Sequence, residues 1–494
     1  MIMDSQASSG SDGTFALILV GSGFASSFFL QRYLQLARPS ARILVLERGE
    51  LRTHRWQVTH INELDRDAQA SFDKERSAKL WAFRLAFGGS SNCWWAGTPR
   101  LLPEDFRLQS RYGVGRDWPV SYDDLEEYYC DAEEIMAVSG PDDGSPFPRS
   151  RPYPQPPHHL TDPDRLFKRR FPHAFFNQPA ARPTRALQSG RPQCCANGVC
   201  ALCPIDSKFT ILNGLQHLYD ADPRVTLLTG ANVLALDVAN DRVTGVRYEV
   251  AGTEHVARAD VVGLGANALF NPFLLLRSGL TGPAVGRGLA DQRSVNVQVD
   301  LRGVDNFQGS TSITGHGYML YSGEHRRSQA AALMETFNVP LLRDERKKWR
   351  QRVRLKFIYD DLPQAENAVT LGRDPTRPEV RYLGPSTYTQ RGIDALETNL
   401  ARVLDALPVE RYRIVPLDPR STDGHILGTT SMGTDPATSV IDRDLIHHRV
   451  RNLLVLGGSV FPTISPANPT LTICALSLWA ADRLMGSPER GRSV

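Results

Sequence analysis

A glycine pattern near the start of the sequence constrains the fold more than any other feature. The apolar run of residues 14–20, TFALILV, leads directly into Gly21, Gly23 and Ser26, spaced as G-x-G-x-x-S, and a helix-like segment follows. A second apolar run, ARILVLE, ends at Glu47. A strand, a tight turn, a helix and a second strand within roughly 35 residues are typical of a dinucleotide-binding unit. We therefore predict an α/β fold with a Rossmann-type lobe.

Each position of this pattern has a physical role. The first glycine permits the tight turn, the second lets the backbone approach a pyrophosphate, and the small Ser26 lets the helix pack closely on the strand. The start of the helix presents unpaired N–H groups to phosphate charge. Glu47 stands 26 residues after Gly21, where a carboxylate can accept hydrogen bonds from ribose hydroxyls. The alternative is a glycine turn in an α/β protein that binds no dinucleotide.

The overall composition argues against some partners. The 494 residues include 57 basic and 54 acidic side chains, for a formal charge of +3, so we expect neither nucleic acid nor an anionic membrane as a partner. The apolar run 261–276 has 16 residues without a charge, and a spanning helix needs about 20. We recognise no secretory signal and expect a cytoplasmic protein without a membrane span, in which structural disulfides are rare.

The remaining segments alternate between clear secondary-structure patterns and irregular stretches. Ser121 and Asp124 can cap a helix that Gly140 can end. Residues 141–163 hold eight prolines and favour an extended excursion. Strand patterns dominate 223–265, and alternating apolar residues over 292–420 predict an antiparallel sheet in a second lobe. The tail is typical of a strand, a loop and a long helix.

Five separated blocks of sequence, in this order, resemble the glucose–methanol–choline (GMC) oxidoreductase family. They are FGGSSNCWWAGTPRLLPEDF (87–106), WPVSYDDLEEYY (118–129), GLGANALFNPFLLLRSG (263–279), GHILGTTSMGTDPATSVID (424–442) and LLVLGGSVFPTISPANPTLTICAL (453–476). The resemblance implies an FAD-binding Rossmann-type lobe and a sheet-based substrate lobe. It also implies oxidation of an alcohol by hydride transfer to flavin N5.

The resemblance also divides the chain into five segments. We predict that the first part of the FAD-binding domain covers 14–120 and the second part 223–291. A helical insertion rich in proline and cysteine covers 121–222, and the substrate-binding domain covers 292–420. The C-terminal part of the FAD-binding domain, with the catalytic residues, covers 421–494.

The resemblance assigns two residues to the chemistry. His425 occupies the family's H-x-x-G-T-x-S-M position and is the expected base, a role that suits a side chain whose pKa lies near neutrality. Asn468 falls where the family has a second His or Asn, and we expect it to hydrogen-bond the substrate oxygen. Asn468, Pro469 and Thr470 also predict the capped start of a helix aimed at the flavin.

The same resemblance predicts the residues that bind the cofactor. They are Gly21, Gly23, Ser26, Glu47, Arg48, Gly88, Gly89, Ser90, Trp94, Val233, Gly265, Gly457, Gly458, Asn468, Pro469 and Thr470. Two positions depart from the family: Gly457 stands where Asp is usual, and Gln292 stands where His is frequent. Residues 309–318, GSTSITGHGY, are a candidate loop over the flavin. Cys93 stands where some relatives bond the flavin covalently through His, and the alternative is a small buried thiol.

Four cysteines lie within ten residues: Cys194, Cys195, Cys200 and Cys203, in the run QCCANGVCALCP. Thiols at this density can wrap one metal centre. Adjacent cysteines suit zinc poorly, whereas certain sugar dehydrogenases of the family hold a 3Fe–4S cluster with a similar run. The spacing leaves open an iron–sulfur cluster (3Fe–4S or 4Fe–4S) or structural thiols without metal.

The expected activity is therefore FAD-dependent oxidation of a sugar, cyclitol or polyol CH–OH group to a carbonyl. No C-x-x-C-H haem motif occurs, so we expect the electrons to reach an external acceptor, a partner protein or a quinone. Three alternatives stay open: an oxidase that uses oxygen, a non-redox lyase or decarboxylase on the same scaffold, and an idle electron-transfer subunit. The pair His425 and Asn468 argues against the last.

Overall fold

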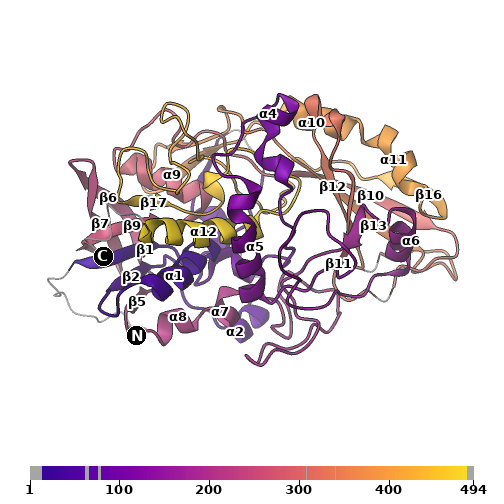
Figure 1. The fold of residues 1–494 in the computed structure, drawn as a ribbon, viewed down its shortest axis with the longest axis horizontal. Coiled ribbons are helices and arrows are strands. Elements are labelled where there is room, and N and C mark those ends of the chain that lie inside the picture. Colours follow the sequence, from indigo (N-terminus) through magenta and orange to yellow (C-terminus); the bar gives the residue numbers. More distant parts are fainter. Residues whose placement is uncertain (1–13, 62–65, 76–78, 308, 340, 487–494) are drawn as a thin grey trace.

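The computed structural model describes residues 14–61, 66–75, 79–307, 309–339 and 341–486. These residues form two lobes side by side (Figure 1). One lobe is built on a five-stranded sheet and the other on a six-stranded sheet. In the part of the chain so described, no helix combines the length and the apolar character that a membrane crossing requires.

The first lobe contains the parallel sheet that the glycine pattern predicts. Its strand order is β17 (Leu453–Val455), β9 (Ala259–Leu264), β1 (Phe15–Val20), β2 (Ile43–Leu46) and β5 (Val225–Leu228), and every neighbouring pair is parallel. Residues of β2 are buried on both faces, as expected when both faces of a parallel sheet are covered. Parts of the chain that are far apart in sequence therefore meet in one sheet.

A layer of three helices covers this sheet. Helix α1 (Phe24–Leu36) packs against α12 (Thr470–Met485), which packs against α5 (Tyr122–Met136), as Figure 1 shows. The three-stranded antiparallel sheet β6 (Asn232–Ala239), β7 (Arg242–Val250) and β8 (Thr253–Ala257) contacts the parallel sheet through β7 and β9. Helix α9 (Asn267–Arg277) contacts β6.

Helix α5 confirms the predicted cap and corrects the predicted end. The Ser121 hydroxyl accepts from the Asp124 N–H at 3.1 Å, and the Asp124 carboxylate accepts from the Ser121 N–H at 2.8 Å. The helix ends at Met136, where Ala137 turns left-handed with φ +52°, so the prediction that Gly140 ends it is wrong. Gly140 instead makes room for an aromatic ring, since a Cβ there would lie 2.4 Å from Tyr153.

The proline-rich stretch is irregular, as predicted. Residues 141–161 contain neither helix nor strand, and α6 (Asp162–Arg170) begins directly after them with Thr161 as its cap. The cap is a reciprocal pair of hydrogen bonds between Thr161 and Asp164. A segment this rich in proline lacks the N–H donors that a helix or a central strand needs.

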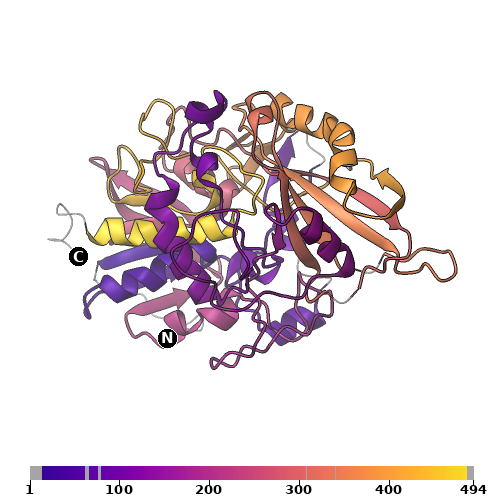
Figure 2. The same ribbon diagram turned by 45° about the vertical axis from the view of Figure 1, so that its right-hand side comes forward.

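The second lobe contains the predicted antiparallel sheet. Its order is β16 (Val409–Ile414), β10 (Arg293–Leu301), β13 (Arg352–Tyr359), β12 (Ala332–Phe337), β11 (Ile313–Leu320) and β4 (Phe175–Asn177). One face is apolar and packs against α10 (Thr387–Asp394) and α11 (Leu396–Leu404), which Figure 2 shows in orange along the outside of the sheet. The other face carries polar residues, because successive side chains of a strand point to opposite faces.

Strand β11 corrects the prediction of a loop at residues 309–318. Residues from Ile313 onward pair with both β12 and β4, so most of that segment is an interior strand. The division of the chain into five segments stays a prediction. The remaining elements are α2 (His54–Thr59), α3 (Arg66–Ala70), β3 (Asp73–Glu75), α4 (Leu108–Tyr112), α7 (Ile211–Gly214), α8 (His217–Asp220), β14 (Ala368–Leu371) and β15 (Pro378–Arg381), with short 3-10 turns at Gly89–Asn92, Pro103–Phe106, Glu324–Arg327 and Gly458–Val460.

Candidate active site

A cavity of about 610 Å³ is lined by residues of both lobes. The first lobe contributes the turn between β1 and α1 and the segment before α12, and the second lobe contributes the polar face of its sheet. This volume lies in the range of small-molecule and cofactor sites. The cavity joins the predicted cofactor residues to the predicted catalytic residues.

The glycine turn has the geometry that a pyrophosphate needs. Gly21 has φ +90°, and a Cβ there would lie 2.8 Å from the carbonyl oxygen of Gly265. A Cβ on Gly23 would meet nothing within 4 Å, so the backbone at Gly23 faces open space. Gly23 also caps α1 without any side-chain hydrogen bond. The first N–H groups of α1 can therefore bind an anionic group.

Glu47 holds the turn together. Its buried carboxylate accepts hydrogen bonds from the Ser22 N–H at 2.9 Å, the Ser22 hydroxyl at 2.7 Å and the Gly49 N–H at 2.8 Å. The Ser22 oxygen in turn accepts from the Gly88 N–H at 2.9 Å. Burial raises the pKa of Glu47, while the bonds from Gly49 and Ser22 oppose that shift. Glu47 lines the cavity, and its contact with ribose stays a prediction.

Most of the predicted cofactor residues line the cavity, and two do not. Ser26 packs against Gly265, since a Cβ on Gly265 would lie 2.1 Å from the Ser26 hydroxyl oxygen. This close approach agrees with the predicted role of Ser26 in packing the helix on the strand. Gly88 has φ +81° and contributes its N–H to Ser22. Those that line the cavity are Gly21, Gly23, Glu47, Arg48, Gly89, Ser90, Trp94, Val233, Gly265, Gly457, Gly458, Asn468, Pro469 and Thr470.

Several buried polar atoms of residues that line the cavity have no hydrogen-bond partner among the described residues. They include His425 Nδ1, Asn468 Oδ1 and Gln178 Nε2. A Cβ on Gly97 would lie 2.9 Å from Gln178 Nε2 and 3.6 Å from Asn468 Oδ1, so these amides converge over a residue without a side chain. Buried polar groups normally have partners. The arrangement fits a ligand with its own donors and acceptors, such as a flavin ring and a substrate hydroxyl.

Helix α12 corrects the predicted cap. Pro469, not Asn468, takes the N-cap position, and no side chain caps the helix. Gln292 instead holds the preceding backbone, because its amide donates to the carbonyls of Ser465 at 2.5 Å and Ala467 at 2.8 Å. Asn468 is therefore free to bind a ligand, and the first turn of α12 keeps its unpaired N–H groups.

His425 is held from its backbone. Its N–H donates to the Asp291 carboxylate at 3.2 Å, and Asp291 is itself paired with Lys79 at 2.8 Å and accepts from Thr422 at 2.7 Å. Burial lowers the pKa of His425, and the carboxylates of Asp291 and Asp423 oppose that shift. The imidazole is therefore neutral at neutral pH and can accept a proton.

A charged pair lies beside His425. Lys356 on β13 binds Asp423 at 2.5 Å and lies 4.0 Å from Glu335 on β12. Burial lowers the pKa of Lys356, but these two carboxylates outweigh it and the net shift is upward. Lys356, Glu335 and Asp423 all line the cavity. Sequence reasoning did not identify them, nor Gln178 and Gly97.

The cysteines do not form a metal site in this arrangement. Among the described residues, no three His, Cys, Asp or Glu side chains lie close enough together to hold a metal ion. The Cys194 thiol contacts the Ser310 carbonyl at 3.4 Å, Cys200 Sγ contacts the Ser312 N–H at 3.5 Å, and Cys195 is exposed. The residues as placed here do not fit an iron–sulfur cluster, and that prediction gains no support. Cys93 lines the cavity, and its covalent attachment to flavin stays untested.

Comparison with known proteins agrees with this geometry. Residues 363–477 match the family model described as GMC oxidoreductase. The fructose dehydrogenase large subunit of Gluconobacter japonicus is 26% identical over 96% of this chain and 98% of its own length. The gluconate 2-dehydrogenase flavoprotein of Pantoea cypripedii is 25% identical over 82% of this chain and 80% of its own length.

Solved structures share the fold. Pyridoxine 4-oxidase from Mesorbium loti superposes with a TM-score of 0.66 and 20% identity, covering 96% of this chain and all of that one. Formate oxidase of Aspergillus oryzae, whose structure addresses FAD modification, superposes with a TM-score of 0.65 and 16% identity over 98% of this chain. The fold is the one that these oxidases share. In sequence the chain is similar to GMC oxidoreductases, through the family-model match at residues 363–477 and through relatives named as dehydrogenases.

Proposed function

We propose that this protein oxidises a CH–OH group of a sugar, cyclitol or related polyol to a carbonyl and passes the electrons to an external acceptor. The observation that supports this most is the pair of unpartnered polar atoms, His425 Nδ1 and Asn468 Oδ1, on the cavity that also contains the glycine turn. FAD, when bound, supplies the acceptor for the hydride. The glycine turn and the start of α12 would hold it.

The protein's own residues supply the acid–base chemistry. The neutral His425 imidazole takes the proton of the substrate hydroxyl as its C–H bond is broken. The Asn468 amide hydrogen-bonds the same oxygen and fixes its orientation. Asp291 keeps the His425 backbone in place through the bond at 3.2 Å. His425 and Asn468 therefore act on the hydroxyl of the CH–OH unit, and Asp291 acts only by holding His425.

The names of the relatives support the substrate class. Fructose, gluconate and 2-methyl-1,2-propanediol appear in the names of proteins 25–26% identical to this chain, and each carries a CH–OH group. The electron acceptor is proposed to be a partner protein or a quinone in the cytoplasm. An oxygen-using enzyme is the alternative, since paromamine 6'-oxidase of Streptomyces fradiae is 25% identical over 96% of this chain.

Anaerobic bleaching of the flavin tests the proposal. Purified protein saturated with FAD is mixed with single sugars, sugar acids, cyclitols and polyols without oxygen, and flavin absorbance is followed. We expect at least one class to reduce the flavin and to yield the matching carbonyl compound. Reoxidation by air with hydrogen peroxide release would favour the oxidase, and conversion of substrate without bleaching would contradict the proposal in favour of a lyase.

A further inference from the structure

The wall of the cavity opposite the glycine turn comes from the polar face of the second sheet. On β13, Arg354 and Lys356 alternate with the buried Val353, Leu355 and Phe357 and line the cavity. Across the strand pair, Lys356 faces Glu335 and Arg354 faces Phe337. Two residues along a strand span about 6.7 Å. The wall therefore carries two cations, Arg354 and Lys356, at neighbouring positions of one strand face.

The two cations differ in their pairing. Lys356, whose charge lowers the pKa of His425, is paired with Asp423 at 2.5 Å and has Glu335 at 4.0 Å as a second carboxylate. No hydrogen bond or ion pair to Arg354 is present among the described residues, and its buried Nε has no partner. Arginine stays charged in proteins. The residue is partly exposed, but its buried Nε donor lacks an acceptor, which is unfavourable. Arg354 therefore has the properties of a site that awaits an anion.

A cation–π contact holds this guanidinium. Its carbon lies 3.8 Å over the ring centroid of Phe337, and Trp95 packs against Phe337 edge-on at 6.2 Å. A contact of this kind uses none of the five N–H donors of arginine. Arg354 lines the cavity, so its donors stay available to a ligand there.

The surroundings favour a carboxylate over a phosphate. One guanidinium fork matches the two oxygens of one carboxylate. Glu335 and Asp423 line the same cavity, so a second negative charge on the ligand would be repelled. The pyrophosphate position lies at the glycine turn of the other lobe, which leaves Arg354 to the substrate.

We propose that Arg354 is the subsite for a carboxylate on the substrate, and that the substrate class is a polyhydroxy acid in which this carboxylate lies several bonds from the oxidised hydroxyl. This inference rests on the proposed function. It assigns specificity to Arg354 and leaves the chemistry with His425 and Asn468.

Matched acid and neutral probes test the subsite. Gluconate and glucitol share a chain and differ in one end group, as do galactonate and galactitol. We expect the acids to reduce the wild-type flavin anaerobically at lower concentration than the polyols. Arg354→Gln should raise the apparent Kd of the acids roughly 10- to 100-fold, as expected for a lost charged hydrogen bond, and leave the polyols unchanged. The apparent Kd of the acids for Arg354→Lys should lie between those of the wild type and Arg354→Gln, because lysine keeps the charge but lacks the planar pair of donors.

The control variant is Arg413→Gln. Arg413 is exposed on β16 and does not line the cavity, so this variant should reduce its flavin with acids and polyols as the wild type does. Calorimetric titration of gluconate into His425→Ala, with and without Arg354→Gln, measures binding without turnover. Equal affinity in these two proteins, or tighter binding of glucitol 6-phosphate than of gluconate by the wild type, would overturn the carboxylate subsite. If neither acids nor polyols bleach the flavin while dithionite does, the proposed function itself fails.

Discussion

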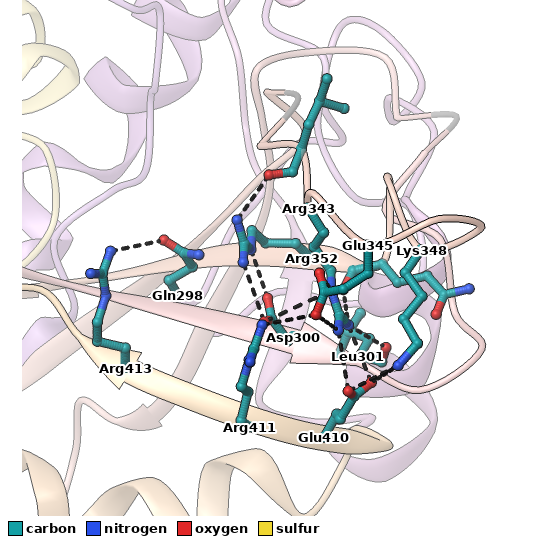
Figure 3. Close-up of polar contacts among 12 residues, drawn as sticks. Gln298, Asp300, Leu301, Arg343, Glu345, Lys348, Arg352, Glu410, Arg411 and Arg413 are labelled. Carbon is teal, nitrogen blue, oxygen red and sulfur yellow. Dashed lines mark hydrogen bonds and ion pairs between the residues drawn. The ribbon is translucent and has the colours of Figure 1, made fainter.

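The polar face of the second sheet carries two charged regions with opposite states of pairing. At its outer end, Arg352 binds Asp300 at 2.6 Å and Arg411 binds the same carboxylate at 2.7 Å (Figure 3). Arg343 joins them through Glu345 at 2.8 Å and Glu410 at 3.2 Å. In the cavity, two residues further along β13 from Arg352, Arg354 has no such partner among the described residues.

The contrast separates a structural cluster from a candidate binding site. Every guanidinium of the outer cluster has a carboxylate, as buried charges require. The Arg343 guanidinium, for example, lowers the pKa of Glu345 to about 2. The cavity instead contains several polar atoms without hydrogen-bond partners, among them His425 Nδ1, Asn468 Oδ1 and Arg354 Nε. Unsatisfied polar groups gathered in one cavity indicate a ligand. The two regions should therefore respond differently to substitution.

The largest effect is expected from His425→Ala. Removal of a general base typically lowers the rate by about 10²- to 10⁴-fold, and we expect this loss in anaerobic flavin reduction. The FAD content and the melting temperature should stay near wild type, because the side chain of His425 has no partner at Nδ1 to lose. Single-turnover reduction at the wild-type rate would remove His425 from the mechanism.

Asp300→Asn in the outer cluster should lower stability and leave flavin reduction unchanged, which is the reverse of the effect expected for His425→Ala. The substitution removes the carboxylate that Arg352 and Arg411 share. Arg411 is 62% exposed and keeps Glu345 at 3.0 Å, so the loss comes mainly from Arg352 and is about 2 kcal/mol, as for a lost charged hydrogen bond. We expect urea denaturation to show this loss while flavin reduction per bound FAD is unchanged. Arg354→Gln is the matched comparison and should not lower stability. A loss of stability there equal to that of Asp300→Asn would contradict the contrast.

The pH dependence of flavin reduction should come from the inner region. Burial lowers the pKa of His425 below its ordinary value, about 6.5. The imidazole accepts a proton only when neutral, so the rate should be constant above this pKa and fall as the pH falls through it. Asp423→Asn should move the fall to lower pH, because the Asp423 carboxylate raises the pKa of His425. A fall centred above 6.5 would contradict the assignment.

The smallest effect is expected from Arg413→Gln at the exposed edge. Arg413 is exposed on β16 and lies across the strand pair from Gln298 (Figure 3). Surface contacts of this kind contribute less than about 0.5 kcal/mol. Thermal unfolding and flavin reduction should both match the wild type. A larger change in either would mean that the outer and inner regions are coupled.

The sequence alone determined the framework of this protein. The apolar runs around Gly21 and Gly23 predicted the parallel sheet because a buried strand, a glycine turn and a helix are each local patterns. The pair Ser121 and Asp124 predicted the start of α5 for the same reason. Alternation along VRLKFIYD predicted a strand of an antiparallel sheet, and this segment forms most of β13. The motif around His425 indicated a residue that lies on the cavity, and its role as the base stays a prediction.

Tertiary structure decided what these elements face. Gly140 makes room for the ring of Tyr153 and does not end α5. Pro469, not Asn468, is the N-cap of α12. Cysteines that are neighbours in sequence make separate contacts. The period-two alternation of a strand shows that Arg352 and Arg354 lie on the same face of the sheet. The pairing of distant strands decides that Arg352 binds Asp300 and that Arg354 lies over the Phe337 ring. Local patterns fix the direction of a side chain, and long-range packing fixes its partner.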